Sequence, residues 1–316
     1  MVYRPRPSVI RRAVEIIRSA PSTRDGVKEI VQKAVGRLPA WRRKTVRAAK
    51  TAYWQSDSEV EHFVRETDAA KVAGAAYMDG VINDFFARNC PKGSSILDVG
   101  CGNGIVTLFL ARRGCSVTAC DISEPMLREL NRNRAALDVK VRRGDAYDLP
   151  FGDAMFDRVV ARMFLYHFPD WPRVLAEMAR CCRPGGRLLI HITSKENADL
   201  ARRECKVSFA MCDLPERGKF GRDSMQWGEF DARSISAAAR RCGLRVVERV
   251  PCTFFHSNPL INFSIGAERS DSYRNQLQNW LSKPDVLAFA KWFEETAVQQ
   301  MPVWISYYNL LVLEKL

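Results

Sequence analysis

The alternation of apolar and polar residues predicts helices in the first part of the chain, followed by alternating strands and helices. In residues 8–49, apolar residues recur at three- and four-residue steps between arginines, as in an amphipathic helix, and prolines divide this pattern into shorter helices. A second helical pattern covers residues 60–88 and ends before a segment that contains proline and glycine.

From residue 94 onward, short apolar runs alternate with helical patterns. The predicted strands are 95–99, 116–120, 139–142, 156–161, 187–192, 244–250 and 304–313. The predicted helices between them are 104–113, 124–134, 171–182, 199–211 and 234–242. Strands that are connected through helices at this spacing form a parallel sheet with right-handed crossovers, so we expect an α/β fold.

These patterns divide the chain into four predicted parts. A basic helical extension covers residues 1–90, an α/β core covers residues 91–256, and a final core strand lies within residues 302–316. The insert at residues 257–301 is expected to form a helical cap. Its clearest element is a helix that starts near Lys283 and Pro284, because proline suits the first turn of a helix.

Composition is that of a globular protein, with 316 residues, 47% hydrophobic and 27% charged. No apolar run approaches the ~18 residues of a membrane-spanning helix, and arginines occupy the N-terminus where a secretory signal needs an apolar core. Most of the net charge of +13 lies in residues 1–50, which hold 14 Lys and Arg against 3 Asp and Glu. This segment fits an anionic membrane surface, nucleic acid, an organellar presequence or a solvated helical face.

The ten cysteines form no C-x-x-C pair. This argues against a zinc ribbon and against a thioredoxin-like redox pair, and we expect no metal site. The cysteines are expected to be reduced and mostly buried in a cytoplasmic protein, with peripheral membrane contact as an alternative.

The predicted chemistry centres on a glycine-rich loop between the first core strand and the next helix. Gly100, Gly102 and Gly104 let a ligand approach the backbone closely and leave helix N–H groups pointing toward it. The spacing differs from the dinucleotide-binding pattern G-x-G-x-x-G, because the third glycine comes one residue early. No Lys-Ser or Lys-Thr pair follows the glycines, so the loop is not a phosphate-binding P-loop.

Several motifs follow one another in order along the core. They are residues 98–104 (DVGCGNG), Asp121, residues 144–151 (GDAYDLPF), residues 156–160 (FDRVV), residues 166–168 (YHF) and residues 175–189, with the turn RPGG at 183–186. In these residues the sequence resembles class I S-adenosylmethionine (SAM) dependent methyltransferases, in particular the small-molecule type of ubiquinone and menaquinone biosynthesis. The resemblance implies a Rossmann-like, doubly wound sheet of seven strands, mostly parallel with an antiparallel last strand.

The resemblance also implies SAM as the cofactor and assigns residues to it. Those expected to bind the cofactor are Asp98, Gly100, Cys101, Gly102, Gly104, Asp121, Ile122, Asp145, Ala146 and Arg162. Asp121 would accept hydrogen bonds from the ribose hydroxyls, and Asp145 would meet the adenine amino group beside the backbone of Ala146. Asp98 would orient the glycine loop.

Methyl transfer to a well-positioned nucleophile needs a base only when the acceptor is a protonated hydroxyl. The candidate base is His167, after the fourth strand, and His256, Tyr307 and Tyr308 are further candidates beside the cap. Residues 161–164 lack the D/N-P-P-Y/F/W element that is typical of enzymes that methylate the amino groups of nucleic acid bases.

We therefore expect a SAM-dependent methyltransferase that modifies an oxygen or carbon of a small-molecule, lipid or sugar acceptor. Aromatic residues within 1–90 and 257–301 would close over the cofactor and shape an apolar or mixed pocket. Two alternatives remain open: an RNA or protein methyltransferase that uses the basic N-terminal segment, and a non-catalytic SAM-binding scaffold. The oligomeric state is not predicted.

Overall fold

The computed structural model describes residues 51–168, 170–204, 230–257 and 276–316. These residues belong to one compact unit, Lys50–Leu316. The helices predicted between residues 8 and 49 lie outside the described residues. Of the helices that are described, none is both long enough and apolar enough to cross a membrane.

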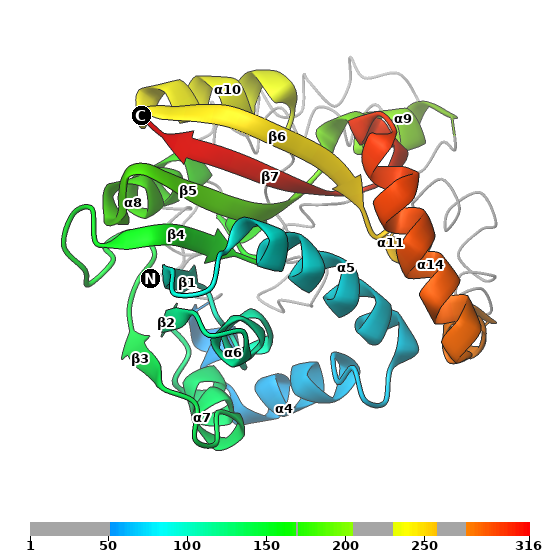
Figure 1. Cartoon of the computed structure of the whole chain (residues 1–316), viewed down its shortest axis with the longest axis horizontal. Helices are drawn as coiled ribbons and strands as arrows, with labels where there is room; N and C mark the ends of the chain where they lie inside the picture. Colours follow the sequence, from blue (N-terminus) through cyan, green and yellow to red (C-terminus); the bar gives the residue numbers. More distant parts are fainter. Residues whose placement is uncertain (1–50, 169, 205–229, 258–275) are drawn as a thin grey trace, which may run out of the picture. The chain divides into compact units, whose positions relative to one another are not determined.

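In the described part of the chain, seven strands form one sheet with the order β3-β2-β1-β4-β5-β7-β6 (Figure 1). They are β1 (Ser95–Val99), β2 (Ser116–Asp121), β3 (Val139–Arg143), β4 (Phe156–Ala161), β5 (Cys182–Thr193), β6 (Leu244–Cys252) and β7 (Tyr308–Lys315). Strands β1 to β5 pair in parallel, and β7 runs antiparallel to both β5 and β6. The predicted Rossmann-like sheet with an antiparallel last strand is confirmed, and its strand order reverses between β1 and β4.

Helices connect the strands and cover both faces of the sheet, with α5 in front of it and α8 behind β5 in Figure 1. The helices are α4 (Asp57–Glu66), α5 (Ala73–Asn89), α6 (Ile105–Arg112), α7 (Glu124–Asn133), α8 (Trp171–Cys181), α9 (Lys195–Glu204), α10 (Ala232–Arg241), α11 (Phe254–Ser257) and α14 (Pro284–Thr296). Short 3-10 turns are η1 (Leu165–His167), η4 (Val298–Gln300) and η5 (Val303–Ile305). Side-chain caps fix some helix starts: Ser123 accepts the Met126 N–H at α7, and Asp231 forms a capping box at α10.

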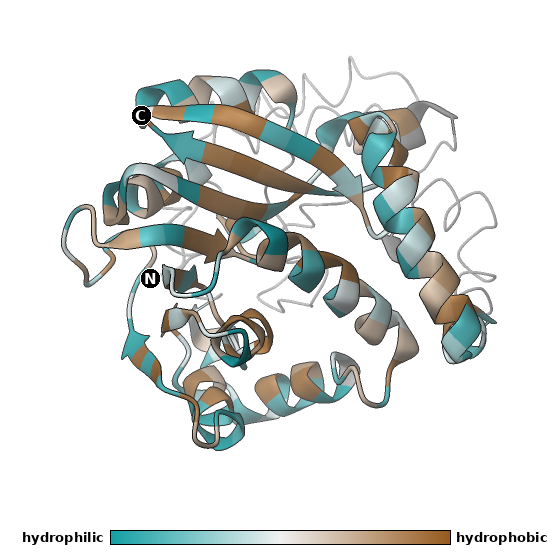
Figure 2. Cartoon of the chain, viewed as in Figure 1, coloured by the Kyte–Doolittle hydropathy of each residue, from teal (hydrophilic) through white to brown (hydrophobic). Residues whose placement is uncertain are grey.

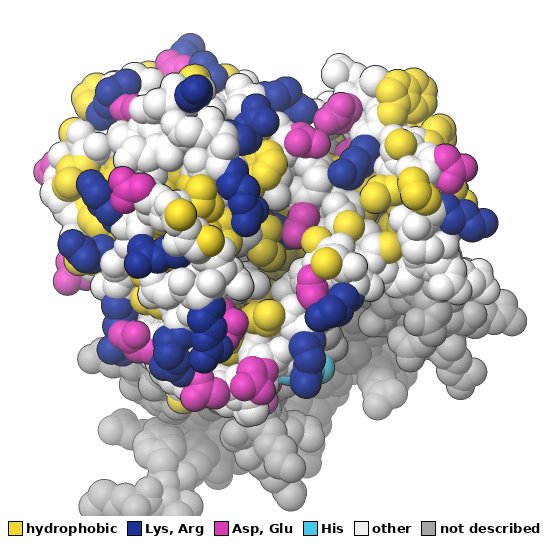
Figure 3. Space-filling model, turned by 60° about the horizontal axis from the view of Figure 1, so that its bottom comes forward, with side chains coloured by type: hydrophobic (Ala, Val, Ile, Leu, Met, Phe, Trp, Pro, Cys, Tyr) yellow, Lys and Arg dark blue, Asp and Glu magenta, His cyan; other side chains and the backbone are white. Residues whose placement is uncertain are grey.

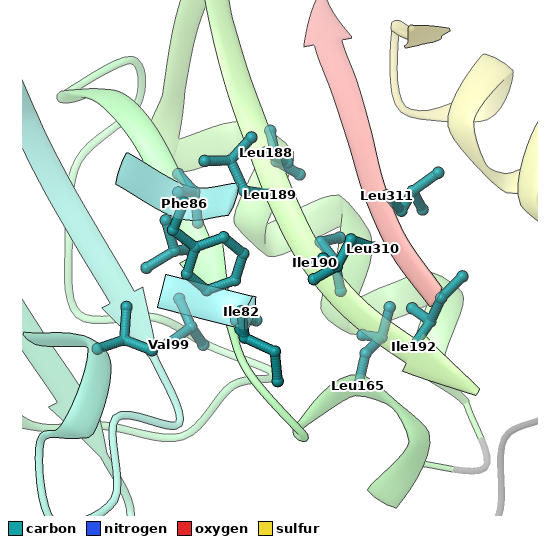
Figure 4. Close-up of a cluster of buried hydrophobic side chains, with 14 of the residues drawn as sticks. Ile82, Phe86, Val99, Leu165, Leu188, Leu189, Ile190, Ile192, Leu310 and Leu311 are labelled. Atoms are coloured by element: carbon teal, nitrogen blue, oxygen red, sulfur yellow. The ribbon is translucent and has the colours of Figure 1, made fainter. Parts of the chain in front are cut away.

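The hydrophobic core lies between the sheet and these helices. The part of β5 from Leu188 onward and most of β7 are buried on both faces, and apolar residues predominate there. Figure 2 shows this apolar character along the central strands, with hydrophilic positions on the outer sides of the helices. In Figure 4, Phe86 of α5 lies beside Leu189 of β5, and both side chains are fully buried.

Helix α14, the clearest helix of the predicted cap, packs along α5 through polar contacts. The Tyr77 hydroxyl donates a hydrogen bond to Glu294, whose Oε2 also accepts the Phe254 N–H at 3.2 Å. Burial raises the pKa of Glu294 to about 7. The end of the Lys291 side chain of α14 lies over Gly80 of α5, where its Cε is 2.4 Å from the place that a Cβ would take.

Four predicted elements differ from the structure. The turn predicted at 183–186 lies inside β5, which begins at Cys182 rather than at residue 187. The single helix predicted at 60–88 is two helices, because the Ala70 N–H donates to the Asp68 side chain and the Lys71 and Val72 N–H groups donate to the Asp68 carbonyl, which forms a turn between α4 and α5. The last strand begins at Tyr308 rather than residue 304, because residues 303–305 form the 3-10 turn η5 after Pro302. The helix predicted at 199–211 already begins at Lys195, and the residues after Glu204 lie outside the described residues.

Candidate functional site

The glycine loop leaves β1 at the point where the strand order reverses. Gly100, Gly102 and Gly104 all have positive φ angles, +69°, +53° and +91°. Residues other than glycine rarely adopt this backbone conformation. A Cβ at Gly100 would lie 2.0 Å from the Phe164 ring, and one at Gly104 would lie 2.3 Å from Leu130 Cδ1. Two of the three glycines are therefore required by the packing of the protein itself.

Gly102 differs from its neighbours, because a Cβ at this position would contact only one atom of the described residues, at an ordinary van der Waals distance. The nearest atom is Met126 Sδ, 3.9 Å away. No described side chain fills the space beside Gly102. A ligand that is bound by backbone N–H groups of the loop would need such a space. This cradle is the first indication of where the predicted cofactor would lie.

Asp98, the residue before the end of β1, is buried with 1% of its surface exposed. Its Oδ2 accepts a hydrogen bond of 2.6 Å from the Thr107 hydroxyl of α6, so the carboxyl group joins the strand to the helix that flanks the loop. Burial raises the pKa of Asp98 to about 7. This arrangement agrees with an orienting rather than a ligand-binding carboxyl group.

Asp121 ends β2 beside the same loop and is partly exposed. Its Oδ2 accepts the Gly102 N–H at 3.0 Å, and its Oδ1 accepts the Ser123 N–H at 2.8 Å. Burial raises the pKa of Asp121, although these N–H groups lower it. An ionised carboxylate has about four acceptor positions, so two remain for a further donor.

Asp145 follows β3 and starts a tight turn. Its Oδ1 accepts the Tyr147 N–H at 3.0 Å, and its backbone carbonyl accepts the Asp148 N–H at 3.0 Å. Ala146 is buried with 7% exposure. The Tyr147 ring contacts Phe168 edge-on, with ring centroids 5.4 Å apart.

The turn after β4 brings a charged and an aromatic side chain to the site. Met163 has a φ of +48°, an unusual conformation for a residue with a side chain, and it turns Phe164 toward Gly100. Arg162, just before it, forms an ion pair with Asp79 of α5, and only 9% of its side chain is exposed. Arg162 therefore connects the carboxyl edge of the sheet to α5.

His167, the candidate base, lies in η1 after β4. Its ring is 4.6 Å from that of Tyr166 and 6.5 Å from that of Trp54, measured between centroids. Tyr307 and Tyr308 meet at the start of β7, with ring centroids 5.1 Å apart, on the same edge of the sheet. The side chain of His256 lies outside the described residues.

The sequence analysis missed Gln55 at this site, whereas Trp54 is one of the aromatic residues that it expected to close over the cofactor. Gln55 donates to the Ile122 carbonyl at 2.8 Å and accepts the Glu124 N–H, and the Ser123 hydroxyl donates to the Trp54 carbonyl. These contacts fix the segment before α4 on the turn that follows Asp121. No motif marks Trp54 or Gln55, because the contacts join residues about 70 positions apart through the backbone.

The structure thus brings most of the predicted site residues to one edge of the sheet. These are Asp98, Gly100, Cys101, Gly102, Gly104, Asp121, Ile122, Asp145, Ala146, Arg162 and His167, from the ends of β1 to β4 and the turns that follow. Open α/β sheets bind their ligands at this edge, outside the carboxyl ends of the strands. In the described ranges, no group of three His, Cys, Asp or Glu side chains could hold a metal ion.

Comparisons with known proteins agree with this geometry. Residues 97–190 match the family model of the methyltransferase domain. The chain is 41% identical over 104 residues to methyltransferase GfsG of Streptomyces halstedii, 37% over 144 residues to O-methyltransferase cnsE of Penicillium expansum, and 33% over 158 residues to demethylmenaquinone methyltransferase of Listeria monocytogenes. These matches cover 31%, 44% and 47% of this chain, and 37%, 48% and 66% of the respective relatives.

Among solved structures, phosphoethanolamine N-methyltransferase 2 of Haemonchus contortus, in complex with S-adenosylhomocysteine, has a TM-score of 0.51 to this chain. The identity is 16%, over 85% of this chain and 60% of that one, so this likeness concerns the fold. Fold and loop together define a Rossmann-like methyltransferase domain. The chain belongs to the class I SAM-dependent methyltransferases, and SAM is the cofactor of its domain.

The packing at Gly100 can be tested by substitution with alanine. Gly100→Ala should lower the free energy of unfolding by about 1–3 kcal/mol more than Gly185→Ala, because only the first substitution drives a methyl group into a ring. Gly185 is the matched control, since its φ is +72° and nothing lies within 4 Å of the place that a Cβ would take there. Urea unfolding measures both values, and equal losses would contradict the described contact with Phe164.

The buried carboxyl group of Asp98 predicts a pH dependence of stability. Its pKa of about 7 in the folded protein exceeds the ~3.9 of an unfolded chain, so the folded state binds more protons between these values. Stability should therefore fall as the pH rises from about 4 to 7 and change little from this group outside that range. Asp98→Asn, which keeps an acceptor for Thr107, should be more stable than the parent at pH 8 by about 1–3 kcal/mol, and the two should converge near pH 4. Parallel stability curves in thermal or urea unfolding would refute this.

Proposed function

We propose that this protein transfers the methyl group of SAM to an oxygen or carbon atom of a small-molecule acceptor. The observation that carries the proposal is the open cradle at Gly102 next to the partly exposed carboxylate of Asp121. The relatives support the acceptor class, because two are an O-methyltransferase and a demethylmenaquinone methyltransferase. The chain spans between about a third and two thirds of their length, so the acceptor itself is part of the proposal.

The residues present fit the cofactor. The two acceptor positions left on Asp121 suit the vicinal hydroxyls of a ribose, and the backbone at Gly102 is free of side chains that would fill the cradle. Asp145 and the buried Ala146 backbone would hold the adenine, and the backbone of Cys101 and Ile122 would line the nucleoside between them. When bound, SAM supplies a methyl group on a sulfonium, which is an excellent leaving group.

The protein's own contribution is to position the acceptor and exclude water. Such positioning alone can supply about 7–11 kcal/mol in the best cases, so a base is needed only for a hydroxyl acceptor. His167 is proposed for that role, since it lies beside Trp54 on the carboxyl edge. Trp54 and Gln55, fixed on the turn after Asp121, would close one side of the site.

The cap is proposed to form the acceptor side of the site. Phe255 of α11 meets Tyr77, Trp280 and Phe293 at ring-centroid distances of 6.2, 5.6 and 5.7 Å, which makes an aromatic cluster between α5 and α14. Aromatic rings give large apolar contact area with little loss of conformational freedom. They suit an acceptor with an apolar or aromatic body.

The basic segment adds no second function to this proposal. It lies in residues 1–50, outside the described residues, so binding to anionic membrane, nucleic acid or a protein substrate stays a prediction. On the face drawn in Figure 3, Lys and Arg side chains are interspersed with Asp and Glu. This mixture differs from the continuous basic surface that binds a polyanion.

The decisive experiment measures the binding of S-adenosylhomocysteine by calorimetry and its release from SAM with candidate acceptors. The protein should bind the nucleoside, and Gly102→Val should abolish this binding, because its side chain would enter the cradle and a β-branched residue is strained at a φ of +53°. Far-UV circular dichroism is the control for the fold. A folded parent protein that binds neither nucleoside would disprove the proposed function, and binding without turnover of any acceptor would favour a SAM-binding scaffold.

Loss of the Asp121 carboxylate should weaken nucleoside binding. Asp121→Ala is expected to cost about 1–3 kcal/mol of binding free energy, because charge-assisted hydrogen bonds to the ribose are lost. Asp157→Ala is the matched control: Asp157 Oδ2 also accepts a backbone N–H, that of Ser95 at 2.9 Å, but at the opposite end of β1. The control should lose stability and keep its affinity. Equal affinities of the two variants would remove the role assigned to Asp121.

A further inference from the structure

The guanidinium of Arg162 is buried with part of its hydrogen-bonding capacity unused. Its Nη2 pairs with Asp79, whereas Nε and Nη1 have no partner among the described residues. Arg249 is an equally buried arginine with 9% exposure, but its two terminal nitrogens both donate to Glu196. Buried charged donors without a partner are costly, so their occurrence at a ligand-binding edge needs a physical reason.

His191 of β5 lies next to Arg162. Ala161, the last residue of β4, pairs with Ile190 of β5, so Arg162 follows directly after this pair on one chain segment and His191 on the other. The charge of Arg162 acts on His191. The His191 side chain has 0% exposure, and neither ring nitrogen has a hydrogen-bond partner in the described part of the chain. Burial and the charge of Arg162 lower the pKa of His191 to about 3, so the ring is neutral and offers one N–H donor.

The charges around this pair leave an excess of positive charge. Asp79 of α5 interacts with both Arg162 and Lys291 of α14, so two cations share one carboxylate. Three other titratable groups among the described residues interact with Arg162: Asp98 of β1, Tyr166 of η1 and Cys252 of β6. Burial raises the pKa of each of them and so disfavours its negative form, and Asp98 already accepts the Thr107 hydroxyl. Glu294 of α14 faces Tyr77 and the Phe254 N–H instead.

We propose that Arg162 and His191 form a binding site for a ligand carboxylate at the carboxyl edge of the sheet, with Asp79 as a positioning residue. This inference rests on the proposed function and adds the chemistry of one group that the site recognises. A carboxylate supplies the negative charge and the acceptors that the unused N–H groups lack. It can come from the amino acid part of the cofactor or from an acidic acceptor, and the two sources are separable.

The first arm of the test compares S-adenosylhomocysteine with its decarboxylated analogue, 5′-(3-aminopropylthio)-5′-deoxyadenosine, by calorimetry. If the carboxylate is the cofactor's, the parent protein should bind the first about tenfold or more tightly than the second. Arg162→Gln should remove this preference by lowering affinity for the carboxylate ligand alone. Arg249→Gln, which removes an equally buried arginine on β6, should keep the preference even if it lowers stability.

The second arm uses protein saturated with S-adenosylhomocysteine and compares 1-naphthoate with 1-naphthamide. If the carboxylate is the acceptor's, the parent should prefer 1-naphthoate by about tenfold or more, and Arg162→Gln, also saturated with S-adenosylhomocysteine, should lose this preference. His191→Leu is a second variant that leaves the ion pair with Asp79 intact, in case Arg162→Gln does not fold. It should reduce whichever preference exists, and His191→Gln, which restores a neutral donor, should recover part of it.

The outcomes separate this inference from the proposed function. Nucleoside binding without a carboxylate preference in either arm, or a preference that survives in both Arg162→Gln and His191→Leu, would overturn the carboxylate site alone. Failure of the parent protein to bind either nucleoside would overturn the proposed function and this inference with it.

Discussion

The hydrogen bond from the Gly102 N–H to the Asp121 carboxylate joins the ends of β1 and β2 at the point on which the site depends. Packing against Phe164 and Leu130 fixes the loop at Gly100 and Gly104. Gly102, between them, directs its N–H at the Asp121 carboxylate, and of the described atoms only Met126 Sδ lies near the place that its Cβ would take. Asp121 needs such donors, because burial otherwise disfavours its charged form. One contact therefore shapes the cradle and keeps a partly used carboxylate beside it.

Charged groups near this edge are stabilised in different ways, and the differences carry functional meaning. Asp98 is buried against a single hydroxyl donor, and Glu294 against Tyr77 and a backbone N–H, and burial raises the pKa of both acids. A carboxyl group can escape the cost of burial by taking up a proton. Arg162 cannot lose its proton in a protein, so its unused donors are a persistent cost that only another acceptor can relieve.

The sequence predicted the core of the fold well because its signals are local. The predicted bounds of β1 and β4 are the same as those in the structure, because each of these short apolar strands ends before a glycine or a polar residue. The break between α4 and α5 was not predictable from periodicity, because it depends on a local turn in which the Ala70 N–H donates to the Asp68 side chain. At the site, the glycines and the strand-end carboxyl groups could be found from spacing, whereas Gln55, Asp79 and His191 act through neighbours that only the folded chain supplies.

The local signals lie in the core of the chain, and the contacts that the sequence could not predict involve segments outside it. The methyltransferase family model covers residues 97–190, which hold the glycine loop, Asp121 and Asp145. The side chains that approach the same edge from outside that range, Trp54 before α4, Asp79 on α5 and Glu294 on α14, come from segments on both sides of it in sequence. The family model therefore covers the residues proposed to bind the cofactor and does not extend to these three side chains. Helix α5 connects the two regions, because its Asp79 pairs with Arg162 at the edge of the sheet and its Tyr77 donates to Glu294 of α14.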